Sequence, residues 1–372
     1  MARLLFVLPV LLSVFLYWLH AYYFAGTFCD SPASLVGKTV IVTGANTGIG
    51  KTTALDLASR GARVILACRS EARAMPAVKE IREKTKNDQV IFMPLDLASF
   101  RSVRDFAASF IEKEGKLNIL INNAGIIGTD DAKLSEDGIE MTMAINYFGP
   151  FLLTNLLVDV MKASGPGGRI VNLNSLLYNF ANPAAFQDFE ALKTDGTAGY
   201  PKENIDLQML DDGTFSQLCR YLPAGIRDWL LSPFVGKSMI RYNNSKMADL
   251  LFTLELARRL AGTGITTYSP HPGVITTEIG MDRNTEKERT SSDFQGLIAT
   301  VITAEFFRKS LEGGAQTTVC CAVDEKRANE SGLYYSDCEP MEVRRPEYRD
   351  AALLAKFYDW SMEVTSLKTH QL

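Results

Sequence analysis

The sequence is short of the residues that metal sites and nucleic-acid-binding surfaces need. It has three histidines, and none of its six cysteines forms a C-x-x-C pair, so we expect no metal site. The same six cysteines in 372 residues make no disulfide framework. Basic residues number 39 against 43 acidic ones, so there is no positive surplus to favour nucleic acid. Chemistry in this chain has to use other groups.

A long uncharged run opens the chain. No charged residue occurs from position 4 to position 29, and residues 4–26 are almost all apolar or aromatic. A helix of twenty-odd residues covers roughly 30 Å, which is enough to cross a bilayer. We therefore expect residues 1–36 to be a membrane anchor and tether. A cleaved signal peptide is the alternative, although the residues near position 25 make a poor small-x-small cleavage site.

A glycine-rich turn follows the first predicted strand, residues 38–43. The glycines have G-x-x-x-G-x-G spacing, and an alanine-rich helical stretch comes directly after them. Strand, glycine turn and helix in this order suit a phosphate group, because glycines allow close approach and a helix N-terminus attracts negative charge. A tight turn without a ligand is the alternative. The expected cofactor contacts of this turn are Gly44, Asn46, Thr47, Gly48, Ile49, Gly50 and Lys51.

The end of the second predicted strand, residues 63–67, favours NADP over NAD. An NAD site usually has Asp or Glu about twenty residues past the glycines, to hold the ribose 2′-hydroxyl. This chain has Cys68 and Arg69 there, and its first acid is Glu71. Arg69 would pair with a 2′-phosphate and Lys51 would add a second cation. For each of these side chains, a solvated surface cation is the alternative.

Strand and helix patterns alternate through the rest of the chain. Further strands are expected at residues 90–95, 117–122, 170–174 and 265–269. This alternation predicts an α/β fold, a Rossmann-type doubly wound parallel sheet in a single domain over residues 37–345. Residues 346–372 are expected to form a closing helix and tail. Ligands bind at the carboxyl ends of such strands, where the sequence places Asp96, Asn123, Ser175 and Pro272.

Tyr242 and Lys246 are four residues apart on a predicted helix and would share one face. A free tyrosine has a pKa near ~10, so proton exchange at neutral pH needs a lowering of roughly three units, or about 4 kcal/mol. A neighbouring ammonium group favours the phenolate and supplies part of that energy. An exposed helix pair is the alternative. The glycine turn, the strand-end Ser175 and the lack of a competing histidine base favour catalysis.

Taken in order, these motifs resemble those of the short-chain dehydrogenase/reductase family over roughly residues 37–340. Other segments are similar to its membrane-anchored retinol dehydrogenase branch, which typically uses NADPH to reduce retinal and other lipid-derived aldehydes. The family motifs are the glycine turn with Thr43, the Asn122-Asn123-Ala124-Gly125 run, Asn146, Ser175, Tyr242 with Lys246, and His271-Pro272-Gly273. The branch motifs are the N-terminal anchor, residues 67–70, 146–149 and 332–338, and a closing helix around 354–360.

The resemblance implies roles for four catalytic residues. Tyr242 would protonate the carbonyl oxygen as hydride arrives from the nicotinamide. Lys246 would lower the pKa of Tyr242 and hold the nicotinamide ribose. Ser175 would hydrogen-bond the substrate oxygen, and Asn146 would hold a water that links Lys246 to solvent.

The same resemblance implies further cofactor contacts. Asp96 would touch the adenine, and Asn123 would line the cofactor path. His271 would belong to the turn over the nicotinamide rather than act as a base. The remaining expected contacts are Ala124, Gly125, Pro272 and Gly273.

The spacing of the catalytic residues departs from the family pattern. Ser175 and Tyr242 lie 67 positions apart, much farther than in most members, so residues 176–240 contain a long insertion. Its first part is acidic and its second part is apolar and aromatic. It would act as a lid over a hydrophobic substrate or dip into the membrane; a surface subdomain that buries its own aromatics is the alternative. Asn174 also replaces the usual small residue.

The sequence therefore predicts a membrane-anchored NADP(H)-dependent oxidoreductase that interconverts a lipophilic alcohol and its carbonyl, with retinol and retinal as the leading pair. A steroid or other lipid carbonyl is the second substrate class, and a non-catalytic NADP(H)-binding scaffold is the third interpretation. The resemblance suggests the endoplasmic reticulum with the domain facing the cytosol, or alternatively a mitochondrial membrane. Whether two copies form a homodimer is left open.

Overall fold

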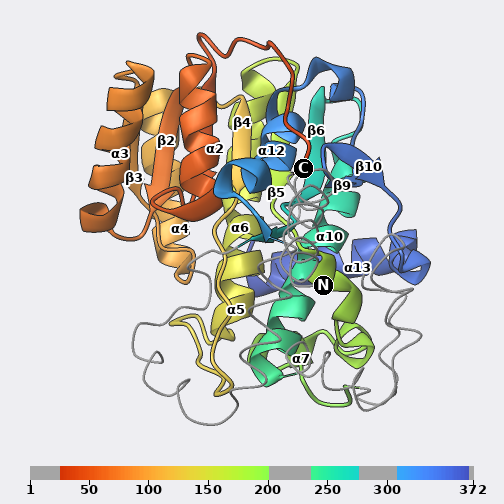
Figure 1. Cartoon of the computed structure of the whole chain (residues 1–372). Helices are drawn as coiled ribbons and strands as arrows, with labels where there is room; N and C mark the ends of the chain where they lie inside the picture. The colour runs from red at the N-terminus through yellow and green to blue at the C-terminus, as the bar shows by residue number, and fades with distance from the viewer. Residues whose placement is uncertain (1–25, 201–235, 276–307, 368–372) are drawn as a thin grey trace, which may run out of the picture.

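The computed structural model describes residues 26–200, 236–275 and 308–367 (Figure 1). Residues 1–25 of the predicted anchor and tether lie outside the described residues. Residues 201–235 of the insertion also lie outside them.

An eight-stranded sheet forms the centre of the described part, with strand order β10-β9-β6-β5-β4-β1-β2-β3. Each pair of neighbours is parallel except β9 and β10, which are antiparallel. The predicted doubly wound α/β fold is therefore confirmed. The strands of this sheet are β1 (Thr39–Thr43), β2 (Arg63–Cys68), β3 (Val90–Pro94), β4 (Ile119–Asn122), β5 (Gly168–Asn172), β6 (Ile265–His271), β9 (Leu333–Ser336) and β10 (Glu339–Met341).

Helices cover both faces of the sheet, and the inward side chains of the strands alternate between two apolar clusters. One cluster joins the sheet to α2, α3 and α12. The other joins it to α4, α6, α10 and α13. The helices are α2 (Gly48–Ser59), α3 (Glu71–Thr85), α4 (Phe100–Glu114), α5 (Met141–Met143), α6 (Gly149–Ala163), α7 (Glu190–Thr194), α10 (Lys237–Arg259), α12 (Leu311–Val323) and α13 (Ala351–Val364).

Most predicted strands lie within two residues of their observed positions, but β9 was not predicted. It is only four residues long and has no flanking apolar run, so its sequence carries little strand signal. It becomes a strand because β6 offers it a parallel partner from Tyr268 to His271. Across its other edge, β10 closes this side of the sheet.

One helical stretch within the described ranges, Met141–Ala163, is long and apolar enough to cross a membrane by length and composition. Of its most apolar window, 83% is buried inside the domain. It combines α5, a π-helical turn (Ala144–Phe148) and α6, and it packs in the core beside α4. Its apolar character is therefore explained by the core.

The described first part of the insertion is attached to helix α10. The backbone N–H of Asn182 donates to Asn244 Oδ1 on α10 at 2.7 Å, and the Asn182 side chain donates to the carbonyl oxygens of Gly196 and Ala198. Asn244 Nδ2 also donates to Gly196 O at 3.0 Å. These bonds fix the segment around residues 182–198 next to the helix that carries Tyr242. In Figure 1, α7 and the start of α10 lie together beyond the lower edge of the sheet.

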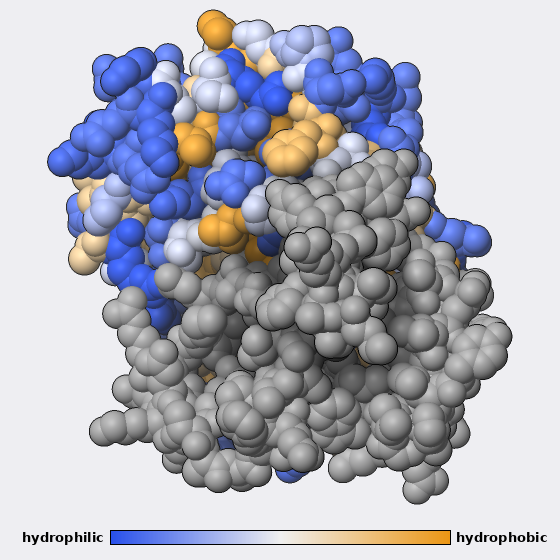
Figure 2. Space-filling model, in the orientation of Figure 1, coloured by the Kyte–Doolittle hydropathy of each residue, from blue (hydrophilic) through white to orange (hydrophobic). Residues whose placement is uncertain are grey.

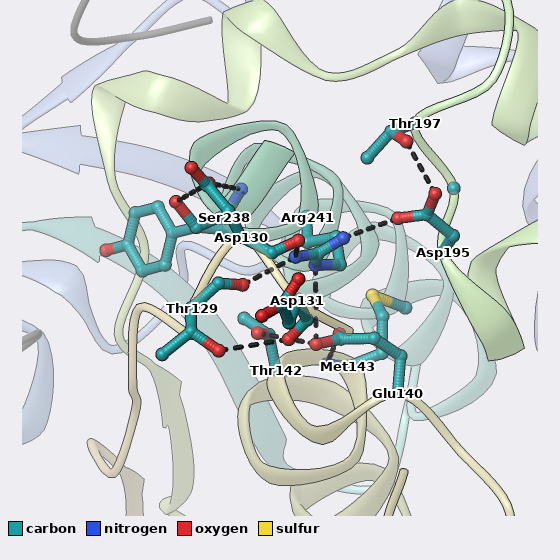
Figure 3. Close-up of polar contacts among 12 residues, drawn as sticks. Thr129, Asp130, Asp131, Glu140, Thr142, Met143, Asp195, Thr197, Ser238 and Arg241 are labelled. Atoms are coloured by element: carbon teal, nitrogen blue, oxygen red, sulfur yellow. Dashed lines mark hydrogen bonds and ion pairs between the residues drawn. The ribbon is translucent and has the colours of Figure 1, made fainter. Parts of the chain in front are cut away.

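Arg241 makes a second attachment, one residue before Tyr242 (Figure 3). Its guanidinium pairs with Asp195 of the insertion and lies 3.6 Å from Glu140 Oε1. It also donates to the carbonyl oxygens of Thr129 and Asp130 at 2.6 and 2.8 Å. Both Arg241 and Glu140 are almost fully buried. One buried cation therefore joins the insertion, the loop after β4 and the start of α5 to the helix of Tyr242.

We predict that Arg241→Met lowers the free energy of unfolding by roughly 3–5 kcal/mol, because it leaves the buried Glu140 carboxylate without its cation. Urea unfolding of the purified protein measures this. Arg101→Met is the matched control: its side chain is 80% exposed and pairs loosely with Glu136, so stability should change by less than about 0.5 kcal/mol. Equal effects of the two substitutions would contradict the assigned role of Arg241.

Candidate active site

The glycine turn after β1 is shaped by close contact with the end of β4. Gly44 has φ +65°, and a Cβ on it would lie 2.9 Å from Ala124 Cα. A Cβ on Gly50 would lie 2.7 Å from Gly44 O. Asn123 fixes this arrangement, since its side chain donates to Thr43 O at 2.8 Å. Only glycine fits at these two positions.

Helix α2 begins directly after this turn without a side-chain cap. Its N-cap residue is Thr47, whose hydroxyl makes no capping hydrogen bond. Thr47 therefore gives the first N–H groups of the helix no side-chain acceptor within the described part of the chain, and Asn46, Thr47 and Gly48 are half-buried around them. Free N–H donors at a helix N-terminus above a glycine turn suit the pyrophosphate of a dinucleotide. Ile49, in contrast, points into a small apolar cluster with Leu173 and Ala315.

The two predicted phosphate-binding cations differ in the structure. Arg69 follows the end of β2, is exposed, and has no hydrogen bond or ion pair within the described ranges. Lys51 pairs with Glu80 on α3 at 2.9 Å. Lys84 and Lys51 together lower the pKa of Glu80 to about 2. Arg69 is therefore available to a 2′-phosphate, whereas Lys51 would have to leave a carboxylate.

The other predicted cofactor contacts lie along the carboxyl ends of β3 and β4. Asp96 Oδ1 accepts a bond from Ala98 N at 3.0 Å and so shapes its own turn. The hydroxyl of Thr43 accepts bonds from the N–H groups of Asn123 and Ala124, both at 3.0 Å. Gly125 follows beside Asn146, whose Oδ1 would lie 3.4 Å from a Cβ at that glycine. The structure brings these residues together with the glycine turn at one edge of the sheet.

Tyr242 and Lys246 lie on the buried face of α10. Tyr242 is 8% exposed and Lys246 5% exposed, and the Lys246 ammonium lies 5.7 Å from the centre of the Tyr242 ring. Lys246 Nζ donates to Leu173 O at 2.8 Å and to Asp249 Oδ2 at 2.9 Å. The ammonium is thus held between the end of β5 and a carboxylate of its own helix. Asp249 was missed in the sequence, although it lies on the same helix face.

Ser175 lies at the end of β5, at the start of a short 3-10 helix (Leu176–Phe180) that packs against α10. Its hydroxyl accepts a bond from Leu177 N at 3.2 Å. The hydrogen bonds of Asn174 give a structural reason for an asparagine where the family usually has a small residue. Its Oδ1 accepts from Ser175 N at 2.7 Å, while its Nδ2 donates to Ser269 Oγ of β6 at 2.8 Å. Asn174 therefore fixes the backbone that presents Ser175.

Asn146 lies in the π-helical turn between α5 and α6, a type of distortion often found at functional sites. Its Nδ2 donates to Ser245 Oγ at 2.9 Å and to Ile126 O at 3.0 Å, and its Oδ1 accepts from Ile126 N at 2.8 Å. Ser245 in turn donates to Tyr242 O at 2.7 Å. The side chain of Asn146 therefore joins the loop after β4 to α10. Its expected role in holding a water remains a prediction.

His271 ends β6 and accepts a hydrogen bond from Leu176 N on Nδ1 at 3.3 Å. It stacks on Tyr334, with ring centres 6.4 Å apart. Burial, helped by the nearby Lys309, lowers the pKa of His271 to about 4, so the ring is neutral at physiological pH. Pro272 and Gly273 follow it, and Gly273 has φ +84° where Lys309 packs against the turn. A neutral ring that already accepts a backbone bond fits the expected turn role rather than a base.

Comparisons with known proteins place this site in a family. The profile of the short chain dehydrogenase family matches residues 38–186. Retinol dehydrogenase 12 of Mus musculus is 39% identical over 86% of this chain and 84% of its own length. Retinol dehydrogenase 13 of Homo sapiens is 39% identical over 93% and 90%, and retinol dehydrogenase 11 of Homo sapiens is 36% identical over 99% of both chains.

Solved structures agree on the fold. A protein of Mycobacterium paratuberculosis superposes with a TM-score of 0.59 at 25% identity, over 92% of this chain and 98% of its own. L-Sorbose reductase of Gluconobacter frateurii superposes with a TM-score of 0.56 at 20% identity, over 82% and 97%. The sequence relatives extend over almost the whole chain, so the likeness is not confined to the glycine turn. The chain belongs to the short chain dehydrogenase family, within the branch of the retinol dehydrogenases, and is an oxidoreductase acting on CH–OH donors.

Proposed function

We propose that this protein is an NADP(H)-dependent oxidoreductase that interconverts a lipophilic alcohol and its carbonyl, with retinol and retinal as the pair. The observation that carries this proposal is the buried face of α10. There Tyr242 lies beside the Lys246 ammonium, and the short helix that follows Ser175 packs against α10. Bound NADP(H) supplies or accepts the hydride.

The chain's own residues would handle the proton. In carbonyl reduction, the Tyr242 hydroxyl donates its proton to the substrate oxygen, and the resulting phenolate is stabilised by the ammonium 5.7 Å from its ring. The Ser175 hydroxyl donates a hydrogen bond to the same substrate oxygen. Alcohol oxidation runs the same steps in reverse, so Tyr242 must then begin as the phenolate.

The preference for NADPH rests on Arg69. It is exposed at the end of β2, where an NAD enzyme would place an acid, and a 2′-phosphate would give its guanidinium a charge-assisted partner. The retinoid substrate rests on the names of the three curated relatives described above, all of which are retinol dehydrogenases. The insertion beside Tyr242 would form part of the wall around such a substrate.

We predict that Tyr242→Phe lowers the rate of NADPH oxidation with all-trans-retinal by roughly 100-fold or more, because the proton donor is lost. NADPH binding, followed by its fluorescence, should change little. The assay uses membranes that contain the full-length protein, with protein-free membranes as the control. A Tyr242→Phe protein with wild-type turnover would rule out the assigned acid, and a wild-type protein that binds NADPH without reducing retinoid, steroid or other lipid carbonyls would point to the scaffold.

Arg69→Asp should weaken NADPH binding by roughly 10-fold or more, because a carboxylate replaces the partner of the 2′-phosphate. NADH, which lacks that phosphate, should bind at least as well as before. Lys51→Ala is the matched comparison and should have the smaller effect, since Lys51 already pairs with Glu80. An unchanged ratio of NADPH to NADH affinity in Arg69→Asp would contradict the cofactor assignment.

We further propose that residues 4–26 attach the protein to a membrane, with the domain in the reducing cytosol, on the endoplasmic reticulum. The described cysteines are free, as that compartment favours. On the face in Figure 2, hydrophilic residues cover most of the described part and apolar residues form small separate patches. Such a surface suits a domain that stands clear of the bilayer.

Removing residues 1–25 should therefore release the protein from membranes while it stays folded. The cut leaves intact the bonds that hold the tether, from Cys29 N to Gln316 Oε1 at 3.0 Å and from Arg60 Nη1 to Ser31 O at 2.6 Å. Sedimentation of membranes, followed by circular dichroism of the soluble fraction, measures both properties. If the shortened protein still sediments with membranes, a second contact exists and the insertion is the first segment to test.

A further inference from the structure

A second ionisable group lies against the proposed catalytic pair. Asp249 is three residues after Lys246 on α10, and it is 5% exposed. Its Oδ2 accepts a bond from Lys246 Nζ at 2.9 Å, so the two opposite charges are in direct contact inside the domain. A buried carboxylate is costly unless it is paired, and here its partner is the ammonium that acts on Tyr242.

We propose that Asp249 is a positioning residue that holds the Lys246 ammonium and limits how strongly it stabilises the phenolate of Tyr242. The inference rests on the proposed function, because it assigns a control to the same proton-transfer group. Lys246 makes two hydrogen bonds to groups of the protein itself, to Asp249 and to Leu173 O.

The net charge beside Tyr242 affects how easily its phenolate forms. An unpaired ammonium 5.7 Å from the ring would favour the phenolate strongly. A carboxylate bound to that ammonium makes the pair neutral at longer range and cancels part of this effect. Replacing Asp249 with a neutral side chain of the same shape should therefore leave the Tyr242 phenolate as the nearest counter-charge of the buried Lys246 ammonium, so that Tyr242 should lose its proton at lower pH.

The net charge of the Asp249–Lys246 pair depends on pH. Burial raises the pKa of Asp249 to about 6, although the bond to Lys246 opposes the rise. For Lys246, burial would lower the pKa, but Asp249 and then Tyr242 outweigh it, so its pKa lies above the usual value. The pair is thus neutral above about pH 6 and carries a net positive charge below it, because only Asp249 changes charge there.

Other groups around the pair do not supply a competing charge in this range. On α10 itself, Tyr242 is the other titratable group that interacts with Lys246. From the π-helical turn, Tyr147 faces Asp249, and burial raises the pKa of Tyr147 well above its usual value. Its hydroxyl is hydrogen-bonded to Ser361 Oγ at 2.7 Å, which lowers this pKa, but burial is the larger effect and the phenol stays neutral. Among the described residues, the charge next to Lys246 that changes near pH 6 is that of Asp249.

The test is the pH profile of Asp249→Asn, which keeps the shape of the side chain and removes its charge. Carbonyl reduction needs protonated Tyr242 and falls at high pH, whereas alcohol oxidation needs the phenolate and rises with pH. Both limbs should move to lower pH by about one unit in the variant. Asp359→Asn is the matched control, because it removes an exposed carboxylate of α13 that pairs with Arg259, which lies roughly 20 Å past Lys246 along α10. Profiles that coincide in wild type and Asp249→Asn would overturn the inference.

A second measurement does not depend on turnover. The ultraviolet absorbance of the phenolate is titrated in wild type and in Asp249→Asn, each minus its own Tyr242→Phe partner, so that the difference reports Tyr242 alone. The inference requires the Tyr242 titration to move down by about one pH unit in the variant. Should Asp249→Asn fail to fold, Asp249→Ser undergoes the same titration.

The two measurements separate the two claims. A shifted titration without turnover of any carbonyl supports the inference about Asp249 and counts against the proposed enzyme. Turnover with an unshifted titration supports the enzyme and overturns the inference.

Discussion

Two buried cations on helix α10 lie on either side of Tyr242, and each must be paired where it lies. A buried charge without a partner would cost several kcal/mol, so the segments that supply the partners are fixed relative to this helix. Arg241 contacts the loop after β4, the start of α5 and the acidic part of the insertion. Lys246 donates hydrogen bonds to Leu173 O at the end of β5 and to Asp249. Tyr242 is placed between these two sets of contacts, and the geometry of the site follows from them.

The described first part of the insertion packs against the main body of the domain. Phe186 and Phe189 in this part are buried against Phe357 and Trp360 of α13. With the bonds to Asn244 and Arg241, this packing couples the insertion to the helix of Tyr242.

The sequence was most informative where the signal is local. The glycine turn needs backbone freedom at Gly44, and the i, i+4 spacing places Tyr242 and Lys246 on one face, so both features could be predicted from short segments. Contacts between residues far apart in the chain could not be predicted in this way. Asp195 meets Arg241 across 46 residues, and Asn174 meets Ser269 across 95, because the fold, not the local sequence, brings them together. Asp249 is local but was missed, since a carboxylate on a helix is usually exposed.

The most direct test of the central claim follows the hydride itself. All-trans-retinal is mixed with the full-length protein in membranes and with NADPH deuterated at the transferring position of nicotinamide C4, and the retinol formed is analysed by mass spectrometry. We expect retinol that carries deuterium at its alcohol carbon, formed faster with NADPH than with equally labelled NADH. Retinol without the label, or no alcohol from retinal or any other lipophilic carbonyl, would contradict it.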